Sequence, residues 1–390
     1  MNEHALEVLE FGLVLERVAA GAGSELARDR ILALRPDTDP AAISRELERV
    51  GATMHFVEED PKWGMVPVPD LTKTLEQLSA EDVVLEPSQL HRTGVLLNSS
   101  RRLSVEFTAR DGHYPELLTI EQLLVSRKDL EDSIARCVDA EGHVLDHASR
   151  DLKKVRGKLR GAHARIVKKL EAFVTRLPER FVVTDGSVTI RDGRYVIPVR
   201  REGRGEVGGI VHDESQSGAT LFVEPPAAIA LMNEVRDLER EERREIRRVL
   251  RELTAEVTME RDTLRGALDA LVDFDGLHAR ARAALSWRTM VPTFAGQDDT
   301  TLHIRDGRHP LLLENDPKSV VPFDLELLEG ERAVVVSGPN TGGKSVFLKA
   351  TGLICALAQS GVVPPVGPGT RLRVFRSFFA DIGDEQSIVQ

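Results

Sequence analysis

The segment Ser337-Gly338-Pro339-Asn340-Thr341-Gly342-Gly343-Lys344-Ser345 matches the pattern G-x-x-x-x-G-K-[ST]. Gly338 and Gly343 allow a tight turn whose backbone N–H groups face an anion at the start of a helix. Lys344 brings a positive charge within reach of a β- or γ-phosphate, and Ser345 offers a hydroxyl ligand to Mg²⁺. These residue types at this spacing predict a phosphate-binding loop for ATP or GTP. The predicted nucleotide-binding residues are Gly338, Pro339, Asn340, Thr341, Gly342, Gly343, Lys344 and Ser345, with Lys344 and Ser345 as catalytic residues and Ser345 as the metal ligand.

The flanks of this loop favour the same interpretation over a chance match. Residues 332–336 are apolar enough for a buried strand, and residues 346–359 form an apolar stretch of helical length. A phosphate loop joins a strand to a helix in this order, whereas an ordinary glycine-rich loop needs neither element.

The second half of a phosphate-loop enzyme is not recognisable after this loop. Such enzymes also need an apolar strand ending in a carboxylate, which holds Mg²⁺ and orients water. The sequence instead continues with a Pro/Gly-rich turn at 361–369, a short strand from Leu372 and a polar stretch containing Asp381, Asp384 and Glu385. We therefore expect an N-terminal fragment of a longer ATPase, which binds nucleotide and hydrolyses it poorly.

Composition excludes several classes of protein. The 390 residues are 41% hydrophobic, 4% aromatic and 29% charged, which is typical of a helix-rich protein with more than one domain. There is no signal-peptide pattern and no apolar run of membrane-spanning length, so a cytoplasmic protein with no membrane contact is expected. Cys137 and Cys355 have no metal-ligand spacing and are expected to be reduced thiols. The net charge of −11 restricts any nucleic-acid contact to local basic patches.

The chain before residue 148 is predicted to be a packed helical domain. Leu6, Leu9, Leu13 and Val18 recur on one helical face. Pro36 closes a helix, and Asp39-Pro40 opens the next one with a capping carboxylate and a proline in the first turn.

Residues 150–177 form one long predicted helix. Apolar residues recur every three or four positions, which gives one stripe: Leu152, Val155, Leu159, Ala162, Ile166, Leu170, Phe173 and Leu177. The other face has an excess of basic residues: Arg150, Lys153, Lys154, Arg156, Lys158, Arg160, Arg165, Lys168 and Lys169. Such a face suits contact with a phosphate backbone, although an ordinary solvated helix surface has the same pattern.

A β-rich segment follows and the chain then returns to helix. Four strands are predicted at 188–190, 195–197, 209–211 and 219–223, with turns at Asp192-Gly193 and around 215–218. Helix is expected from 227 to 288 with a break near 273–276, followed by a linker at 287–300. Residues 239–251 carry both charge signs and are interpreted as an ion-paired helix surface rather than a ligand site.

Several segments together resemble the MutS superfamily of ATPases. The loop is similar to the Walker A sequence of that superfamily, in which Pro-Asn at its second and third positions is characteristic, and Arg308-His309-Pro310 looks like the element that precedes it. Within the superfamily, residues 195–199, 209–213, 217–225 and 379–388 resemble the second bacterial MutS lineage, a paralogue linked to suppression of recombination. Residues 5–11 fit the start of that lineage, so the likeness covers essentially the whole chain.

The resemblance implies a homodimer whose levers and clamps embrace DNA while two ATPase domains sandwich ATP and Mg²⁺. It also implies a serine loop, a Walker B Asp-Glu pair and a C-terminal Smr nuclease domain beyond Gln390. Val320 and Val321 would pack against the adenine. Two residues depart from the family pattern: Ser345 replaces the usual threonine and keeps its hydroxyl, and Val389 stands where an acidic residue is usual.

The expected fold is mainly α, with long lever helices and a small β clamp, followed by a truncated α/β P-loop ATPase domain of the MutS/ABC type. The predicted segments are a helical core domain at 1–147, a lever helix at 148–178, a β-rich clamp at 179–225, returning lever helices at 226–290 and the N-terminal half of the ATPase domain at 291–390.

The predicted function is an ATP-dependent clamp that binds branched or duplex DNA and suppresses homologous recombination, with an endonuclease activity carried by the missing C-terminal domain. The predicted DNA contacts are Lys153, Lys154, Arg156, Lys158 and Arg160 on the long helix and Arg200, Arg201 and Arg204 on the turn after a strand. A plain surface loop is an equal alternative for these last three arginines. Such contacts read DNA shape rather than base sequence. One alternative is a factor that uses ATP to split stalled ribosomes and binds ribosomal RNA. Another is a coiled-coil ATPase of the structural-maintenance type, which is disfavoured because its phosphate loop precedes the stalk.

Three further motifs receive structural interpretations. Phe56-Val57-Glu58 and the Phe-Val-Glu at 222–224 match the Phe-x-Glu wedge of mispair readers by letters alone, so mismatch recognition is not predicted. His212-Asp213 lacks the third partner of an acid/base site. His309 is interpreted as a structural residue rather than a nucleotide contact.

Overall fold

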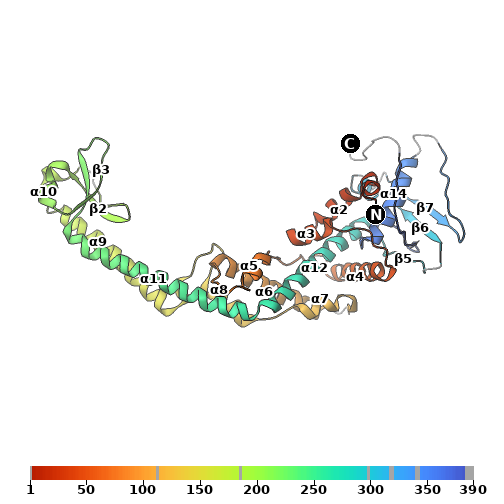
Figure 1. Cartoon of the computed structure of the whole chain (residues 1–390), viewed down its shortest axis with the longest axis horizontal. Coiled ribbons are helices and arrows are strands. Elements are labelled where there is room, and N and C mark those ends of the chain that lie inside the picture. Colours follow the sequence, from red (N-terminus) through yellow and green to blue (C-terminus); the bar gives the residue numbers. More distant parts are fainter. Residues whose placement is uncertain are drawn as a thin grey trace. The chain divides into compact units, whose positions relative to one another are not determined.

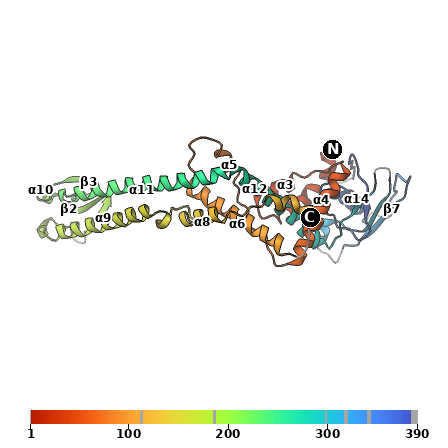
Figure 2. The same ribbon diagram turned by 90° about the horizontal axis from the view of Figure 1, so that it is seen from below.

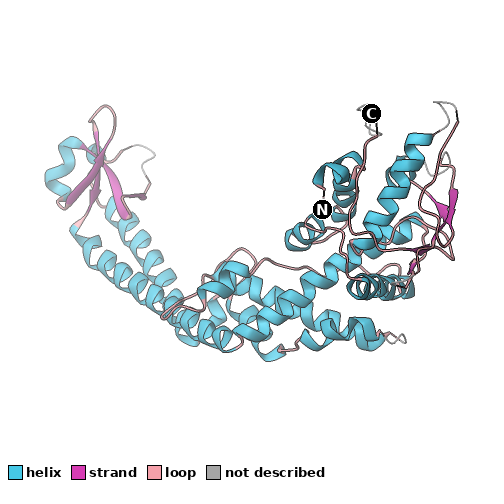
Figure 3. Cartoon of the chain, turned by 45° about the vertical axis from the view of Figure 1, so that its right-hand side comes forward, coloured by secondary structure: helices cyan, strands magenta, loops and turns pink. Residues whose placement is uncertain are grey.

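The computed structural model describes residues 2–110, 114–183, 187–296, 299–315, 320–338 and 343–382. These residues form a mainly helical protein with small sheets, as expected (Figure 3). The chain divides into two compact units: unit 1 comprises Met1–Gln77, Arg92–Glu131 and Glu260–Gln390, and unit 2 comprises Leu78–His91 and Asp132–Met259. Within the described ranges, every helix is too short or too polar to cross a bilayer.

Unit 1 consists of helices and one small sheet (Figure 1). Its helices are α1 Glu3–Val8, α2 Phe11–Ala19, α3 Glu25–Leu32, α4 Pro40–Glu59, α5 Thr72–Gln77, α7 Leu118–Leu123, α12 Arg261–Trp287, α13 Pro310–Asn315 and α14 Lys344–Gln359. Its strands are β5 Thr293–Phe294, β6 Leu302–Gly307, β7 Phe323–Leu327 and β8 Arg371–Leu372, in the order β5-β8-β6-β7. Helices α6 Pro87–Ala109 and α8 Lys128–Cys137 contribute residues to both units.

Unit 2 contains a pair of long helices and a second sheet. Its further helices are α9 Arg150–Val174, α10 Arg204–Val207 and α11 Pro226–Met259. Its strands are β1 Thr189–Arg191, β2 Arg194–Arg200, β3 Ile210–Glu214 and β4 Thr220–Glu224, all antiparallel, in the order β1-β2-β4-β3. All four strands predicted from the sequence are therefore confirmed. Asp192 and Gly193 both have positive φ (49° and 70°), which is the backbone of the tight hairpin turn that the Asp-Gly pair predicts.

Helices α9 and α11 of unit 2 lie side by side in opposite directions (Figure 2). The stripe predicted on α9 faces α11 and the sheet: Ala162, Ile166 and Leu170 are fully buried with Val235 of α11 and Val223 of β4. Leu159, Phe173 and Leu177 are partly buried against the same core. The helix ends at Val174 rather than at Leu177, because Pro178 disfavours helical backbone at the residue before it.

The core of unit 1 is organised around α12, which packs against α2, α3, α4 and α7. Phe56 of α4 is fully buried, and its ring lies 5.3 Å from Phe274 of α12 and 5.4 Å from Trp63. Offset and edge-to-face aromatic contacts of this kind add to the stabilisation from burial alone. Because Phe56 is a core residue, it cannot insert into DNA, which agrees with the absence of a predicted mispair reader.

The predicted helix break near 273–276 is wrong. The chain breaks at Glu260, between α11 and α12, while Asp273, Asp275 and Gly276 lie inside α12. Asp273 and Asp275, which resemble a helix breaker in the sequence, make tertiary contacts instead. Asp275 is fully buried and accepts hydrogen bonds from the backbone N–H of Gly23 and Ser24 (2.9 and 2.8 Å) and from the Ser24 hydroxyl (2.6 Å).

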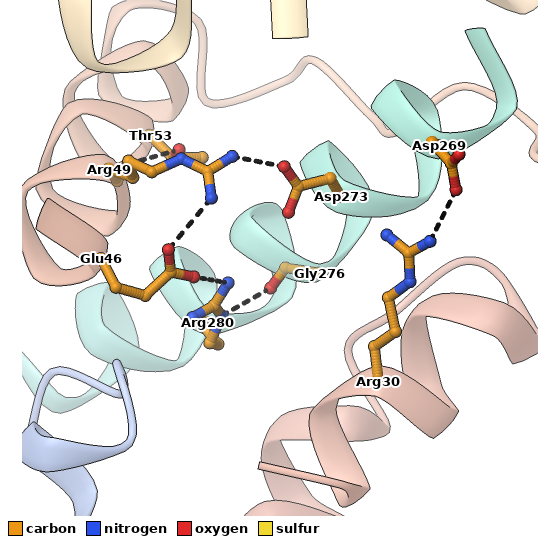
Figure 4. Close-up of polar contacts among 8 residues, drawn as sticks. All are labelled: Arg30, Glu46, Arg49, Thr53, Asp269, Asp273, Gly276 and Arg280. Atoms are coloured by element: carbon orange, nitrogen blue, oxygen red, sulfur yellow. Dashed lines mark hydrogen bonds and ion pairs between the residues drawn. The ribbon is translucent and has the colours of Figure 1, made fainter. Parts of the chain in front are cut away.

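A polar network joins α4 to α12 (Figure 4). Arg49 pairs with Glu46 (3.0 Å) and with Asp273, and Arg280 pairs with the other oxygen of Glu46 (2.8 Å). The guanidinium of Arg280 also donates to the carbonyl of Gly276 (3.2 Å). Burial raises the pKa of Glu46, but Arg280 and Arg49 outweigh this effect and hold the pKa below its usual value. The network therefore keeps Glu46 ionised while it joins the two helices.

Most of the N-terminal pattern is confirmed, with one exception. Leu6, Leu9 and Val18 are buried, whereas Leu13 is 36% exposed. The pattern is not continuous because Glu10, with φ of 60°, separates α1 from α2 and turns the chain. The side chain of Asp39 accepts the N–H of Ala41 and caps α4, as predicted.

Two predictions near the sheet of unit 1 are wrong. Residues 332–336 form no strand, and the side chains of Val334 and Val335 are 45% and 91% exposed. An apolar run becomes a strand only where a neighbouring strand takes up its backbone hydrogen bonds, and no described residue does so. The expected linker at 287–300 instead contains β5, which pairs in parallel with β8. This pairing joins segments far apart in sequence, which a local pattern does not reveal.

We predict that Asp275→Ala lowers the free energy of unfolding by about 3 kcal/mol, because three donors lose a buried acceptor. Chemical denaturation measures the change. Asp269→Ala on the same helix is the control: Asp269 pairs with Arg30, and both side chains are more than half exposed, so the loss stays within about 1 kcal/mol. Equal losses for the two variants would contradict the assigned role of Asp275.

Candidate functional site

The two glycines at the ends of the phosphate-loop motif both adopt backbone conformations that favour glycine. Gly338 has φ of 153° and Gly343 has φ of 77°, values that other residues rarely adopt. Gly343 is the N-cap of α14, so the helix begins at Lys344, close to the predicted start at residue 346. The loop residues Pro339, Asn340, Thr341 and Gly342 lie outside the described residues.

Lys344 and Ser345 occupy the first turn of α14. The Lys344 ammonium Nζ donates a hydrogen bond to the carbonyl oxygen of Gly338 at 2.5 Å, across the loop. Ser345 is exposed. The first-turn N–H groups of a helix have no acceptor within the helix, and the helix dipole favours an anion there. This end of α14 therefore has the positive charge, the hydroxyl and the backbone donors that a nucleotide phosphate with Mg²⁺ requires.

The remaining residues predicted for nucleotide binding are only partly described. Val320 is half-buried and Val321 is 84% exposed, so both have surface available for a ligand. Asp381 is exposed at the end of the described chain. Asp384, Glu385 and Val389 lie outside the described residues. Among the residues that the structure describes, no group of three His, Cys, Asp or Glu side chains could hold a metal ion.

Helix α14 is fixed to the N-terminal helices by contacts that sequence patterns did not identify. Lys349 is 9% exposed and pairs with the carboxylate of Glu10 at 3.3 Å. At the other end of the helix, the Gln359 amide donates to the carbonyls of Asp37 (2.6 Å) and Phe375 (2.9 Å). A side-chain methyl at Gly352 would lie 2.9 Å from Leu9, so α14 approaches the N-terminal turn closely. In the sequence, only Lys349, a charged residue within an otherwise apolar helical stretch, indicated such a polar tertiary contact.

His309 is a buried residue beside this ion pair. It is 1% exposed, and neither ring nitrogen has a hydrogen-bond partner among the described residues. Burial lowers the pKa of His309 to about 4; the Glu10 charge opposes this shift and the Lys349 charge adds to it. The side chain is thus neutral at pH 7 and has no access to a ligand, in agreement with its structural interpretation.

The basic face predicted on α9 is partly neutralised within unit 2. Arg156 is half-buried and pairs with Glu242 of α11 and with Asp146, both at 2.7 Å. Arg160 pairs with the same Asp146 at 3.1 Å, and Lys154 lies 3.7 Å from Asp151. Lys153 and Lys158 are exposed, and no ion pair to either of them occurs among the described residues. Of the five predicted α9 contacts, these two lysines are therefore the most available to a polyanion.

The other predicted contacts lie after strand β2. Arg200, Arg201 and Arg204 are all exposed. Arg201 is held by Glu214 (2.6 Å) and by the carbonyl of Gly218 (2.6 Å). The structure brings Arg200, Arg201 and Arg204 together on one short segment of unit 2, at the end of β2 and the start of α10.

The polar residues of the sheet in unit 2 have structural partners. His212 does not pair with Asp213: its Nε2 lies 2.8 Å from the carboxylate of Glu224, while Asp213 pairs with Arg191 at 3.2 Å. Glu224 is 1% exposed and also pairs with Arg194 at 3.0 Å. The structural interpretation of His212 is therefore confirmed, and the Phe-Val-Glu at 222–224 cannot read mispairs because its glutamate is already bound.

The two cysteines are free, as predicted. Burial raises the pKa of the Cys355 thiol to about 12. The thiol is therefore protonated and unreactive at pH 7.

We predict that the stability of the protein falls as the pH is lowered from about 6.5 to 4.5. His278 of α12 shares the properties of His309: burial lowers its pKa to about 4. A histidine whose pKa is lower in the folded than in the unfolded state stabilises the fold above the unfolded pKa, and this contribution is lost as the pH falls toward the folded pKa. The expected loss is up to about 3 kcal/mol for each residue.

Denaturant unfolding at several pH values tests this expectation. The double variant His278→Leu and His309→Leu should show a flatter dependence on pH in that range. His55→Leu is the control, because the His55 side chain is 78% exposed. An unchanged pH dependence in the double variant would contradict the assignment of the stability loss to protonation of His278 and His309.

Comparisons with known proteins agree with the resemblance seen in the motifs. No protein-family model matches the chain. Curated relatives named Endonuclease MutS2 do match it along its whole length: the protein of Gemmatimonas aurantiaca is 46% identical over 393 residues, that of Pelotomaculum thermopropionicum 39% over 390, and that of a Geobacillus species 36% over 396. The chain covers 48% of the first relative and 49% of the other two, so it spans about half the length of the curated relatives it matches. The recognition from motifs is thus confirmed: this chain is homologous over its full length to proteins named Endonuclease MutS2.

Proposed function

We propose that the protein containing this chain is an ATP-dependent DNA-binding clamp of the MutS type. The observation that carries the nucleotide site is the geometry at the start of α14, where Gly338 and Gly343 have positive φ and Lys344 Nζ reaches across the loop to Gly338. The DNA partner is supported by relatives named Endonuclease MutS2 and by the exposed basic residues of unit 2.

Each residue of the loop has a distinct proposed role. The backbone N–H groups at the start of α14 bind phosphate oxygens, Lys344 neutralises β- and γ-phosphate charge, and the Ser345 hydroxyl binds Mg²⁺. Val320 and Val321 provide apolar surface for the adenine. Bound Mg²⁺ would offset the charge that develops on the phosphates during transfer.

Hydrolysis also needs a carboxylate that holds the metal and orients water. Because the relatives are about twice as long as this chain, we propose that this carboxylate, the endonuclease activity and the surface for a homodimer belong to the whole protein. The exposure of Val334 and Val335 supports this proposal, since an apolar run beside a phosphate loop is normally covered by neighbouring strands. Suppression of recombination stays a prediction from the resemblance, as does the alternative of splitting stalled ribosomes.

We predict that the 390-residue chain binds a fluorescent ATP analogue and that Lys344→Ala weakens binding at least about tenfold, because a charge-assisted phosphate contact is lost. Fluorescence anisotropy measures the affinity. Lys73→Ala, at an exposed lysine of α5, serves as the control and should bind normally. Equal affinities for the two variants would refute the phosphate loop, and a turnover number on the order of 1 s⁻¹ or more would refute the predicted poor hydrolysis.

We predict that the chain binds duplex DNA and four-way junctions with an affinity that falls steeply with salt, because backbone contacts release counterions. Competition between labelled junctions and purified ribosomes separates the two candidate functions. Displacement by unlabelled junctions but not by ribosomes supports the DNA function. Binding to ribosomes alone would favour the ribosome alternative.

A further inference from the structure

Helix α11 carries a continuous strip of arginines along one side. The members of this arginine strip, all exposed, are Arg236, Arg240, Arg243, Arg244, Arg247 and Arg251. With about 100° of rotation per residue, the six lie within a sector of roughly 100°. Every position of α11 between 236 and 251 that falls in this sector is an arginine. The mixed charge seen along the sequence is therefore separated in space.

The acids of α11 lie on other sides of the helix, and those that face α9 have partners. Glu242 pairs with Arg156 and Glu234 with Arg165, each at 2.7 Å. Glu245 accepts a hydrogen bond from the hydroxyl of Ser149 at 2.5 Å. The contact between the two helices thus uses carboxylates of α11 and basic side chains of α9.

Little opposite charge reaches the strip itself. Arg240 pairs with Asp237 at 3.2 Å, and both side chains are more than 60% exposed, so this pair is weak. In the described part of the chain, no ion pair to the other five arginines occurs. The prediction that residues 239–251 form an ion-paired surface is correct for Arg248, which binds Glu245 and Glu252. It is wrong for Arg243, Arg244, Arg247 and Arg251.

We propose that the arginine strip of α11 binds the phosphate backbone of duplex DNA. The inference rests on the proposed DNA function and names the surface that carries it. Guanidinium groups form bidentate hydrogen bonds with phosphates. The strip extends over about 22 Å at 1.5 Å per residue, with a cation every three or four residues, which is well over half of the roughly 34 Å helical turn of DNA.

The composition of the strip indicates which class of partner it binds. Protein interfaces have an apolar or aromatic core, and this sector contains only arginine. Single-stranded nucleic acids bind on aromatic side chains that stack with bases, and α11 has no Phe, Tyr or Trp. A purely cationic ridge with no group that reads bases fits a regular double-stranded backbone, bound without sequence preference.

Salt-dependent DNA binding by two matched variants of the chain tests the proposal. The strip variant carries Arg236→Gln, Arg243→Gln and Arg247→Gln. The comparison variant carries Lys153→Gln, Lys158→Gln and Lys168→Gln on α9, where all three lysines are exposed. Glutamine has a helix propensity close to that of both residues, and circular dichroism verifies that the helices are retained. Anisotropy of a labelled duplex is measured between about 50 and 200 mM salt.

The strip variant should bind the duplex at least about tenfold more weakly and lower the slope of log K against log salt by about 2 to 3, close to 0.9 for each lost phosphate contact. The α9 variant should change both quantities less. A strip variant with the affinity and slope of the unchanged chain would overturn the assignment while leaving the DNA function intact, and so would a loss confined to the α9 variant.

Two further results separate the inference from the function on which it rests. An unchanged chain that binds no duplex at the lowest salt would overturn the DNA function and the strip together. With a double-stranded RNA of the same sequence, a comparable loss on RNA and DNA supports a backbone contact, whereas a loss on RNA alone would overturn the proposal.

Discussion

The position of Lys344 depends on how the rest of α14 is held in unit 1. The first turn of this helix is open to solvent, but from Lys349 onward its side chains are largely buried. Burying a lysine is costly unless a carboxylate compensates its charge, and Glu10 supplies that carboxylate from the turn between α1 and α2. Because the far end of the helix is bonded to Asp37 and Phe375 through Gln359, α14 is fixed at two points along its length.

The same N-terminal helices are joined to α12, so α14 belongs to a larger polar framework. Arg280 of α12 donates to the carbonyl of Gly361, just after α14, at 3.0 Å, and pairs with Glu46 of α4. Asp275 of α12 binds the start of α3. These contacts join residues that are far apart in the sequence. They make the first 60 residues part of the packing that holds α14 in unit 1.

In unit 2 the distribution of charge follows from how two helices pack. The carboxylates of α11 that face α9 neutralise Arg156 and Arg165, two residues of the basic face that the sequence indicated as suited to a phosphate backbone. An excess of arginine is left on the outer side of α11, where the sequence alone indicated ion pairing. Lys153 and Lys158 remain exposed on α9, but Arg156 serves as a structural residue within the helix pair.

The sequence by itself determined several local elements and the backbone conformation at the two ends of the loop. Helical periodicity predicted α9 and α14, an Asp-Gly pair predicted the β1–β2 turn, and the spacing of Gly338, Gly343 and Lys344 predicted the conformations found there, because each depends on residues close together in the chain. Only the tertiary structure decided that residues 273–276 continue a helix, that residues 332–336 form no strand, that β5 pairs with β8, and which cations stay unpaired. Those outcomes depend on partners supplied from distant parts of the chain, and a local pattern carries no information about whether such a partner is present.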